Sequence, residues 1–406
     1  MRGGSRAMIG LAVAALLVAG GCSSRDDDRA DESAAGAAAI ATATTTAAPA
    51  RPVTEAQLQA FADDLVAETG ADGGIVAWRV GDEEPLVVTA GQTAADGGRA
   101  PRREDAFHVA SITKSFVAAA LVLLAADDAV DLDLDDPLGD HVDWPGGADI
   151  TVRHLLDQTS GLARFGNAHQ TPEEEAAYFD LLQQGGAITL ADTLAAARDL
   201  PPVAAPGEGT AYSNLNYVLA GAVIEAVTGQ DVGAVLQERL FTPLGMGDTW
   251  YPPQRAGDAE PLPGLYDVDA GVPVLPTSTF DMEPWRTITA PAAGAVSTLD
   301  DLLTWTDAVL RDHEIGGVDV AAMTDIGPGG YGLGVAGVTD DGACIFDGCA
   351  PDQAFTRWGL NGDIPGSSTR VLHDPATDAT LVVYLDRNAL ELDGPMLDFV
   401  TDGAAG

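Results

Sequence analysis

The residues best suited to chemistry lie in the stretch ASITKSF, residues 110–116, which contains the only lysine of the chain, Lys114. Every other residue among its 20 Lys and Arg is an arginine. A lysine amine can act as a base once burial or a neighbouring cation lowers its pKa, whereas a guanidinium stays protonated. Ser111 precedes Lys114 by three residues, so on a helix both side chains share one face. We therefore predict that Ser111 is a nucleophile and Lys114 its base.

A second group of candidate residues lies in the segment PGEGTAYSNLNY, where a loop leads into a predicted helix. A tyrosine held near a lysine can transfer protons, and an amide can contact both a substrate carbonyl and the lysine. Tyr212 and Asn214 would provide these two groups. The alternative is a structural role, because Ser213 or Asn214 is also a suitable N-cap for the helix.

Several motifs together resemble the serine β-lactamase-related family, which groups class C β-lactamases, D-alanyl-D-alanine carboxypeptidases and related esterases. The segments that carry the resemblance occur in the order and spacing of that family: HVASITKSFVAAALVLLAADDAVDLDLDDPL, ITVRHLLDQTSGL, PGEGTAYSNLNYVLAGAVIEAVTGQ, RLFTPLGMGDTW, AAGAVSTLDDLLTW and NGDIPGSS. The resemblance covers roughly residues 54–390 and is specific as a set. It implies a sheet domain with an all-helical lobe and a cleft between them.

The resemblance also implies a role for each candidate residue. Ser111 would form the acyl-enzyme, Lys114 would be its base, and Tyr212 would relay a proton to the leaving group. Asn214 would orient the substrate. The backbone N–H groups of Ser111 and Asp363 would form the oxyanion hole.

The third motif of the family, a strand with Lys-x-Gly or His-x-Gly, is matched here by Leu360-Asn361-Gly362. Gly362 fits the motif, because the backbone must lie close to the substrate there. Leu360 departs from it, since leucine supplies neither a cation nor a donor for a substrate carboxylate. Arg357 and Arg370 are candidates to replace that cation. The departure favours substrates without the carboxylate, such as esters, or a weakened enzyme.

The order of predicted elements indicates the fold class. Strands are predicted at 74–80, 86–89, 331–338, 355–360, 367–373 and 380–385, from their composition and alternation. Helices are predicted at 54–68, with Thr54 and Gln57 as a capping box, and at 111–126, 152–158, 172–184, 190–199, 214–228, 232–240, 299–311 and 394–401. We therefore expect an α/β (α+β) fold, β-lactamase/transpeptidase-like. An antiparallel sheet flanked by N- and C-terminal helices would carry an inserted helical lobe at roughly 130–325.

The N-terminus predicts export. Residues 1–21 combine Arg2 and Arg6 with a short apolar run and small residues, as in a signal peptide. Cys22 directly follows Ala19-Gly20-Gly21 and is the expected lipidation site, which would anchor the protein to the outer face of the cytoplasmic membrane. Cleavage and release is the alternative. Residues 22–52 are polar and small and predict a disordered tether, followed by the hydrolase domain at 53–406.

The remaining cysteines and histidines predict no metal site. Cys344 and Cys349 would be left as a pair in an oxidising compartment, so we expect a local disulfide. The six histidines, among them His108, His141 and His169, lack zinc-ligand spacing. The glycine pattern GLGVAG at 332–337 lies outside a strand-to-helix context, so we expect packing glycines there and no dinucleotide site.

The composition limits the partners. The formal charge of −42 at pH 7 disfavours binding to nucleic acid or to anionic lipid, so contact with a membrane would come only through the N-terminal lipid. No cofactor is implied, and the oligomeric state stays open. We expect an exported serine hydrolase that acts through an acyl-enzyme on an ester or amide, with a small-molecule or peptidoglycan-type substrate. The alternative is a catalytically weak or inactive cell-envelope binding protein on the same scaffold.

Overall fold

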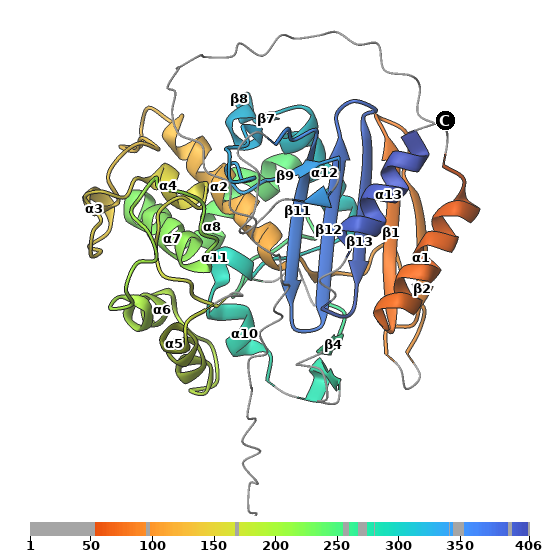
Figure 1. Cartoon of the computed structure of the whole chain (residues 1–406), viewed down its shortest axis with the longest axis horizontal. Coiled ribbons are helices and arrows are strands. Elements are labelled where there is room, and N and C mark those ends of the chain that lie inside the picture. Colours follow the sequence, from red (N-terminus) through yellow and green to blue (C-terminus); the bar gives the residue numbers. More distant parts are fainter. Residues whose placement is uncertain are drawn as a thin grey trace, which may run out of the picture.

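The computed structural model describes residues 53–94, 98–166, 170–254, 260–266, 274–279, 281–340, 342–343, 353–388 and 392–404. Its main feature is a seven-stranded antiparallel sheet in the order β10-β9-β11-β12-β13-β1-β2 (Figure 1). The strands of this sheet are β1 (Gly73–Val80), β2 (Leu86–Gly91), β9 (Ala336–Thr339), β10 (Gly342–Ala343), β11 (Arg357–Ile364), β12 (Ser367–Asp374) and β13 (Ala379–Leu385). Two come from the N-terminal part and five from the C-terminal part, which confirms the predicted fold class.

The helices fall mostly between the two sets of strands. They are α1 (Glu55–Thr69), α2 (Thr113–Ala125), α3 (Leu138–His141), α4 (Val152–Leu156), α5 (Pro172–Leu182), α6 (Leu190–Ala197), α7 (Asn214–Thr228), α8 (Val232–Leu236), α9 (Thr242–Leu244), α10 (Glu283–Thr287), α11 (Ala290–Ala293), α12 (Leu299–Thr306) and α13 (Asp393–Ala404). Short 3-10 segments are η1 (Ala110–Ile112), η3 (Thr277–Thr279) and η5 (Ala321–Thr324), while η2 (Gln237–Phe241) and η4 (Asp307–Arg311) are π-helical. Two-residue strands form three further pairs, β3 (Phe107–His108) with β6 (Val296–Ser297), β4 (Leu265–Tyr266) with β5 (Leu275–Pro276), and β7 (Glu314–Ile315) with β8 (Val318–Asp319).

The sheet separates two hydrophobic cores, because successive side chains on a strand point to opposite faces. On one face, α1 and α13 cover the sheet and pack against residues such as Val383 (Figure 1). On the other face, Leu360 and Val382 belong to the larger core that includes α2, α7 and α12. The two predicted terminal helices therefore share one face of the sheet, and the site residues predicted from sequence must lie on the other.

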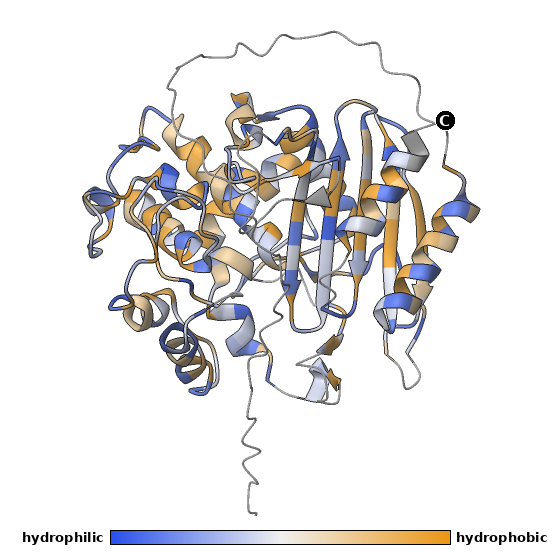
Figure 2. Ribbon diagram, viewed as in Figure 1, coloured by the Kyte–Doolittle hydropathy of each residue, from blue (hydrophilic) through white to orange (hydrophobic). Residues whose placement is uncertain are grey.

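Helix α2 is the centre of the larger core. Every residue from Thr113 to Leu124 is buried, as the nearly all-round apolar pattern predicted. In Figure 2, α2 is hydrophobic along most of its length, whereas α1 alternates between hydrophilic and hydrophobic residues. A helix without a polar face must be surrounded by protein, and this position fixes the depth at which Lys114 is buried.

Local signals at helix starts were informative. Thr54 and Gln57 form the predicted capping box at α1, with both reciprocal hydrogen bonds present. Ser213 is the N-cap of α7 and accepts a hydrogen bond from the Leu215 N–H. These caps use side chains within three residues of the backbone groups that they satisfy, which is why sequence alone could identify them.

Two predicted strands were placed wrongly. Residues 331–335 form no strand, because Gly334 adopts φ +76° and turns the chain against α2, and β9 begins only at Ala336. A Cβ at Gly334 would lie 2.9 Å from the Lys114 carbonyl oxygen, so glycine is required there. The strand predicted at 355–360 begins at Arg357 and continues to Ile364, through the glycine of the third motif.

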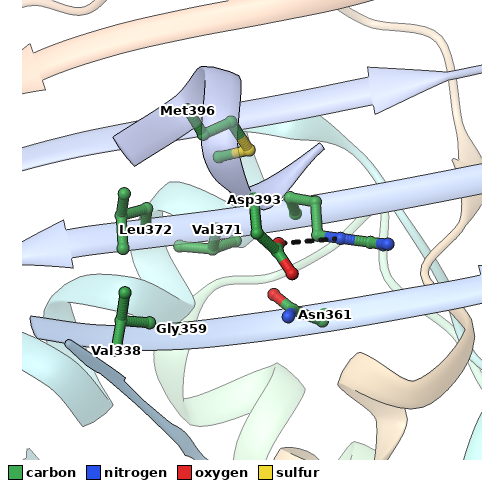
Figure 3. A pocket seen from close by; sticks show the side chains of 8 residues that line it. Val338, Gly359, Asn361, Val371, Leu372, Asp393 and Met396 are labelled. Atoms are coloured by element: carbon green, nitrogen blue, oxygen red, sulfur yellow. Dashed lines mark ion pairs between the residues drawn. The ribbon is translucent and has the colours of Figure 1, made fainter. Parts of the chain in front are cut away.

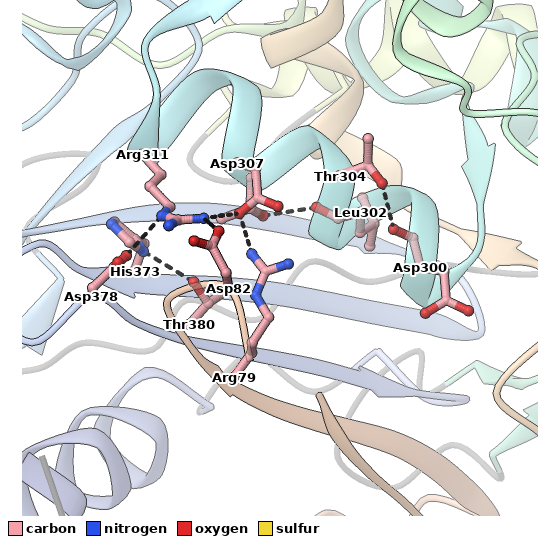
Figure 4. A network of polar contacts seen from close by, with 11 residues as sticks. Arg79, Asp82, Asp300, Leu302, Thr304, Asp307, Arg311, His373, Asp378 and Thr380 are labelled. Atoms are coloured by element: carbon pink, nitrogen blue, oxygen red, sulfur yellow. Dashed lines mark hydrogen bonds and ion pairs between the residues drawn. The ribbon is translucent and has the colours of Figure 1, made fainter. Parts of the chain in front are cut away.

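A polar network fastens η4 to the end of the sheet (Figure 4). Arg311 forms ion pairs with Asp82 at 2.7 Å and with Asp378 at 3.1 Å, and Arg79 of β1 pairs with Asp307. The network joins residues 79–82, near the N-terminal end of the fold, and Asp378, near its C-terminal end, to η4.

Several predictions fall outside the described residues. These are the signal peptide, the tether, lipidation of Cys22, the Cys344–Cys349 disulfide and the position of His169. Within the described part of the chain, no single helix combines the length and hydropathy needed to cross a membrane. One bent pair, Asn214–Thr228 with Val232–Leu244, reaches both only when its two halves are taken together.

Candidate active site

Ser111 lies at a tightly constrained turn between β3 and α2. It is the middle residue of η1, and Ala110 before it is fully buried with φ +45°, a conformation that costs a non-glycine residue about 1–3 kcal/mol. The Thr113 hydroxyl stabilises the turn by donating to the Ala110 carbonyl at 2.6 Å and accepting from the Ala295 N–H at 3.0 Å. No residue type around Ala110 signals this conformation. It presents Ser111, which is partly exposed, at the start of a buried helix.

The Lys114 amine is completely buried and has three polar neighbours. Its Nζ lies 2.9 Å from Ser111 Oγ, 2.7 Å from Asn214 Oδ1 and 3.0 Å from the Ala292 carbonyl oxygen. Burial lowers the pKa of Lys114 well below its ordinary value, which favours the neutral amine over the ammonium form.

The neighbours of the neutral amine define the direction of the proton. An NH₂ group has two N–H donors and one lone pair. The Ala292 carbonyl can only accept, and Asn214 also presents its oxygen, because its Nδ2 donates to the Gly166 carbonyl at 2.5 Å. Both N–H groups are thus used, and the lone pair is left for the Ser111 hydroxyl. In this arrangement Ser111 Oγ–H donates to Lys114, which is the arrangement that a general base requires.

Tyr212 completes the group around Ser111 and Lys114. The Lys114 Nζ lies 4.8 Å from the centre of its ring. Burial raises the pKa of the Tyr212 hydroxyl, and a hydrogen bond with the Ser111 side chain only partly opposes that shift. Tyr212 is therefore a neutral phenol that can donate a proton, while Lys114 is a neutral amine that can accept one. Their environments push the two groups into complementary protonation states.

Gln158 is a supporting residue that the sequence analysis did not single out. It is fully buried at φ +64°, and its Oε1 accepts from the Ser213 N–H at 2.9 Å and from Asn216 Nδ2 at 2.5 Å. These bonds hold the segment that carries Tyr212 and Asn214. A glutamine in the segment DQTSGL gives no sequence signal for a left-handed backbone, so only the structure could identify it.

Strand β11 forms the opposite wall of the site. β12 pairs with β11 from Trp358 to Ile364, but β9 pairs only as far as Gly359, so among the described residues the outer edge from Leu360 onward has no neighbouring strand. The Ser111 turn packs on the site face of β11 at Gly362. A Cβ added to Gly362 would be 2.1 Å from the Val109 carbonyl oxygen and 3.1 Å from the Ser111 nitrogen. The glycine of the third motif therefore permits the contact between the strand and the nucleophile's own turn.

The two arginines considered as replacements for the missing cation do not reach the site. Arg357 and Arg370 are an odd number of positions from Leu360 or from its cross-strand partner Val371, so both point to the opposite face of the sheet. Arg357 pairs there with Asp340 at 2.8 Å and Asp374 at 3.2 Å. Leu360 itself is buried on the site face. The suggestion that either arginine replaces the cation is wrong.

A small open pocket lies beside Ser111. Among the described residues, its lining contains no Asp, Glu, Lys or Arg, and consists of Ser111, Ile112, Tyr212, Tyr331, Gly334, Ala336, Gly359, Leu360 and Asn361. At the position where the third motif usually has a lysine or histidine, the pocket is therefore lined by the apolar Leu360. Among the residues described, no cluster of three or more His, Cys, Asp or Glu side chains is placed to hold a metal ion.

Comparison with known proteins shows which family and which solved structures the chain is similar to. The Beta-lactamase family profile matches residues 58–404. The chain is 29% identical over 352 residues to esterase EstB of Burkholderia gladioli, covering 75% of this chain and 84% of the esterase. Among solved structures it is similar to a D-stereospecific amidohydrolase from Streptomyces sp., with a TM-score of 0.66, 27% identity and coverage of 87% and 98%. It is also similar to the D-amino acid amidase of Ochrobactrum anthropi SV3 in complex with L-phenylalanine amide, with a TM-score of 0.68, 26% identity and coverage of 86% and 96%.

Proposed function

Since the chain belongs to the beta-lactamase family, whose members are serine hydrolases, we propose that it hydrolyses an ester or amide through an acyl-enzyme on Ser111. The observation that carries the proposal is the buried Lys114 amine, which lies 2.9 Å from Ser111 Oγ and has the carbonyl oxygens of Asn214 and Ala292 as its other two polar neighbours. A methionine could fill the same space at a lower desolvation cost. Packing alone therefore does not explain a buried amine whose lone pair faces a hydroxyl.

The proposed reaction uses groups that are already in contact. Ser111 Oγ attacks the substrate carbonyl carbon as its proton passes to Lys114 Nζ. The developing oxyanion is bound by the backbone N–H groups of Ser111 and Asp363. The neutral Tyr212 hydroxyl gives its proton to the leaving group and is replenished from Lys114, while Asn214 holds the amine in place. Water then attacks the acyl carbonyl, the bond between Ser111 Oγ and the acyl group breaks, the carboxylic acid leaves, and one proton of the water returns to Ser111 Oγ.

The proposed substrates have an uncharged acyl group. Leu360 occupies the position of the family's cation, and none of the described residues that line the pocket beside Ser111 is charged. A substrate carboxylate placed there would lose its hydration without gaining a partner. The name of the esterase among its relatives agrees with this preference, and the names of the amidases support amide substrates as a second class.

The test is covalent labelling followed by a substrate series. A fluorescent fluorophosphonate should label the wild-type protein and the matched variant Ser115→Ala, whose serine is fully buried one turn further along α2, but not Ser111→Ala. Hydrolysis of p-nitrophenyl esters should then exceed that of nitrocefin and of D-Ala-D-Ala peptides, and Leu360→Lys should narrow this difference. If folded wild-type protein takes no label, the rival proposal of a cell-envelope binding protein is favoured.

The proposal includes export as a lipoprotein. It rests on the sequence of residues 1–22 alone, where Cys22 follows three small residues. Metabolic labelling with an alkyne fatty acid should mark the wild-type protein and be lost in Cys22→Ser. Release of unlabelled wild-type protein into the medium would favour simple secretion.

A further inference from the structure

A buried arginine lies directly behind the strand that borders the site. Gly362 faces the Ser111 turn, so its neighbours Asn361 and Asp363 point to the opposite face of the sheet, toward α13. Arg370 of β12 is paired with Asn361 and lies on that same face. Figure 3 shows this side of the sheet, where Asp393 at the start of α13 forms an ion pair with Arg370, drawn as a dashed line.

The Arg370 guanidinium contacts β11, β12 and α13 at once, and only 3% of the side chain is exposed. Its Nη2 donates to Asp363 Oδ2 at 2.8 Å, and its Nη1 donates to the carbonyl oxygens of Gly362 at 3.1 Å and Thr369 at 3.2 Å. Its Nε lies 3.4 Å from Asp393 Oδ1. The planar fork is thereby fixed from several directions.

The contact with the Gly362 carbonyl has a consequence for Asp363. That carbonyl and the Asp363 N–H belong to the same peptide unit, and in a planar trans peptide they point in opposite directions. With the oxygen turned toward Arg370, the N–H is directed toward the other edge of β11. This is the edge without a neighbouring strand in the described structure, and β11 residues from Gly359 to Asn361 line the pocket beside Ser111 there. A cation on the carbonyl oxygen also polarises the peptide and strengthens its N–H as a donor.

We propose that Arg370 is a positioning residue, which holds and polarises the Gly362–Asp363 peptide from behind the sheet so that the Asp363 N–H faces the oxyanion. This inference rests on the proposed hydrolase function and adds to it a residue that never touches the substrate. Asp363 and Asp393 have the complementary task of holding the guanidinium in one place.

The first arm of the test is kinetic. Arg370→Met should lower kcat for a p-nitrophenyl ester by about ten- to a hundredfold with little change in KM, when rates are divided by the concentration of labelled active sites. Affinity for a boronic acid that mimics the tetrahedral state should fall by a similar factor. Arg370→Lys, which keeps a cation but not the fork, should lie between the two.

Arg357→Met is the matched control. Arg357 is an arginine of β11 on the same face with two aspartate partners, but it is not bonded to the Gly362–Asp363 peptide. Its kcat should stay within twofold of wild type. If Arg370→Met misfolds because two half-buried carboxylates lose their partner, a variant that combines it with Asp363→Asn and Asp393→Asn removes all three charges and should show the same loss of kcat.

The second arm does not depend on activity. A crystal structure of Arg370→Met, or of the combined variant, should show the Gly362–Asp363 peptide rotated from its wild-type plane. An unchanged peptide plane would overturn the inference, as would a kcat within twofold of wild type or an equal loss in Arg357→Met. If the wild-type protein itself forms no acyl-enzyme, the proposed function fails, and the peptide plane alone then decides the role of Arg370.

Discussion

Gly362 contacts the Ser111 turn, so the effect of substituting it on catalytic activity can be worked out from the structure. Gly362→Ala adds one methyl group at a position where the backbone conformation is ordinary, so only space is at issue. The added Cβ would lie 2.1 Å from the Val109 carbonyl oxygen, which is a backbone atom and cannot rotate away. Either β11 or the 109–111 segment must move.

The size of that movement sets the expected loss. Cβ contacts shorter than 3.0 Å are essentially not found, so the gap has to widen from 2.1 Å by about 0.9 Å. The Ser111 nitrogen is in the same contact, and a misplacement of about 1 Å costs on the order of a hundredfold in rate. We therefore expect kcat/KM to fall about a hundredfold, which corresponds to about 2.7 kcal/mol of transition-state stabilisation. Overpacking should also cost about 1–3 kcal/mol of folding stability.

The assay compares ester hydrolysis per labelled active site, at a temperature well below the melting transition of each variant. The control is Gly247→Ala, because Gly247 is exposed and a Cβ there meets no atom within 4 Å. It should keep kcat/KM within twofold. Folded Gly362→Ala with kcat/KM within threefold of wild type would refute the reasoning, since the strand could then not be what fixes the position of the nucleophile.

A further prediction concerns the protonation of Asp386. Burial raises the pKa of the Asp386 carboxyl to about 7 from 3.8, so its contribution to stability is greatest below pH 4 and is lost as the pH rises through 7. Asp386→Asn keeps the acceptor for the Asp72 and Gly73 N–H groups and should raise the free energy of unfolding at pH 8.5 by up to about 4 kcal/mol, with no gain at pH 4 in urea titrations. The exposed Asp128→Asn measures the general effect of removing one negative charge, and an equal gain there would exclude the explanation from burial.

The sequence by itself determined the features that depend on near neighbours. The capping box of α1, the N-cap of α7 and the apolar pattern of α2 each involve groups within a few residues of one another, and their outcome does not depend on the rest of the chain. The spacing of Ser111 and Lys114 is of the same kind. The prediction that Arg357 replaces the missing cation could have been rejected from the sequence alone, because residues three apart on a strand point to opposite faces.

The tertiary structure decided the chemistry of the site. Lys114 meets Asn214 and Ala292, which are 100 and 178 positions away in the chain, and these contacts determine which way its lone pair points. The same holds for Gly362 against Val109, and for Arg370 held by an aspartate of the last helix. Protonation state and donor direction depend on the surroundings that packing creates, and a linear pattern of residue types does not contain those surroundings.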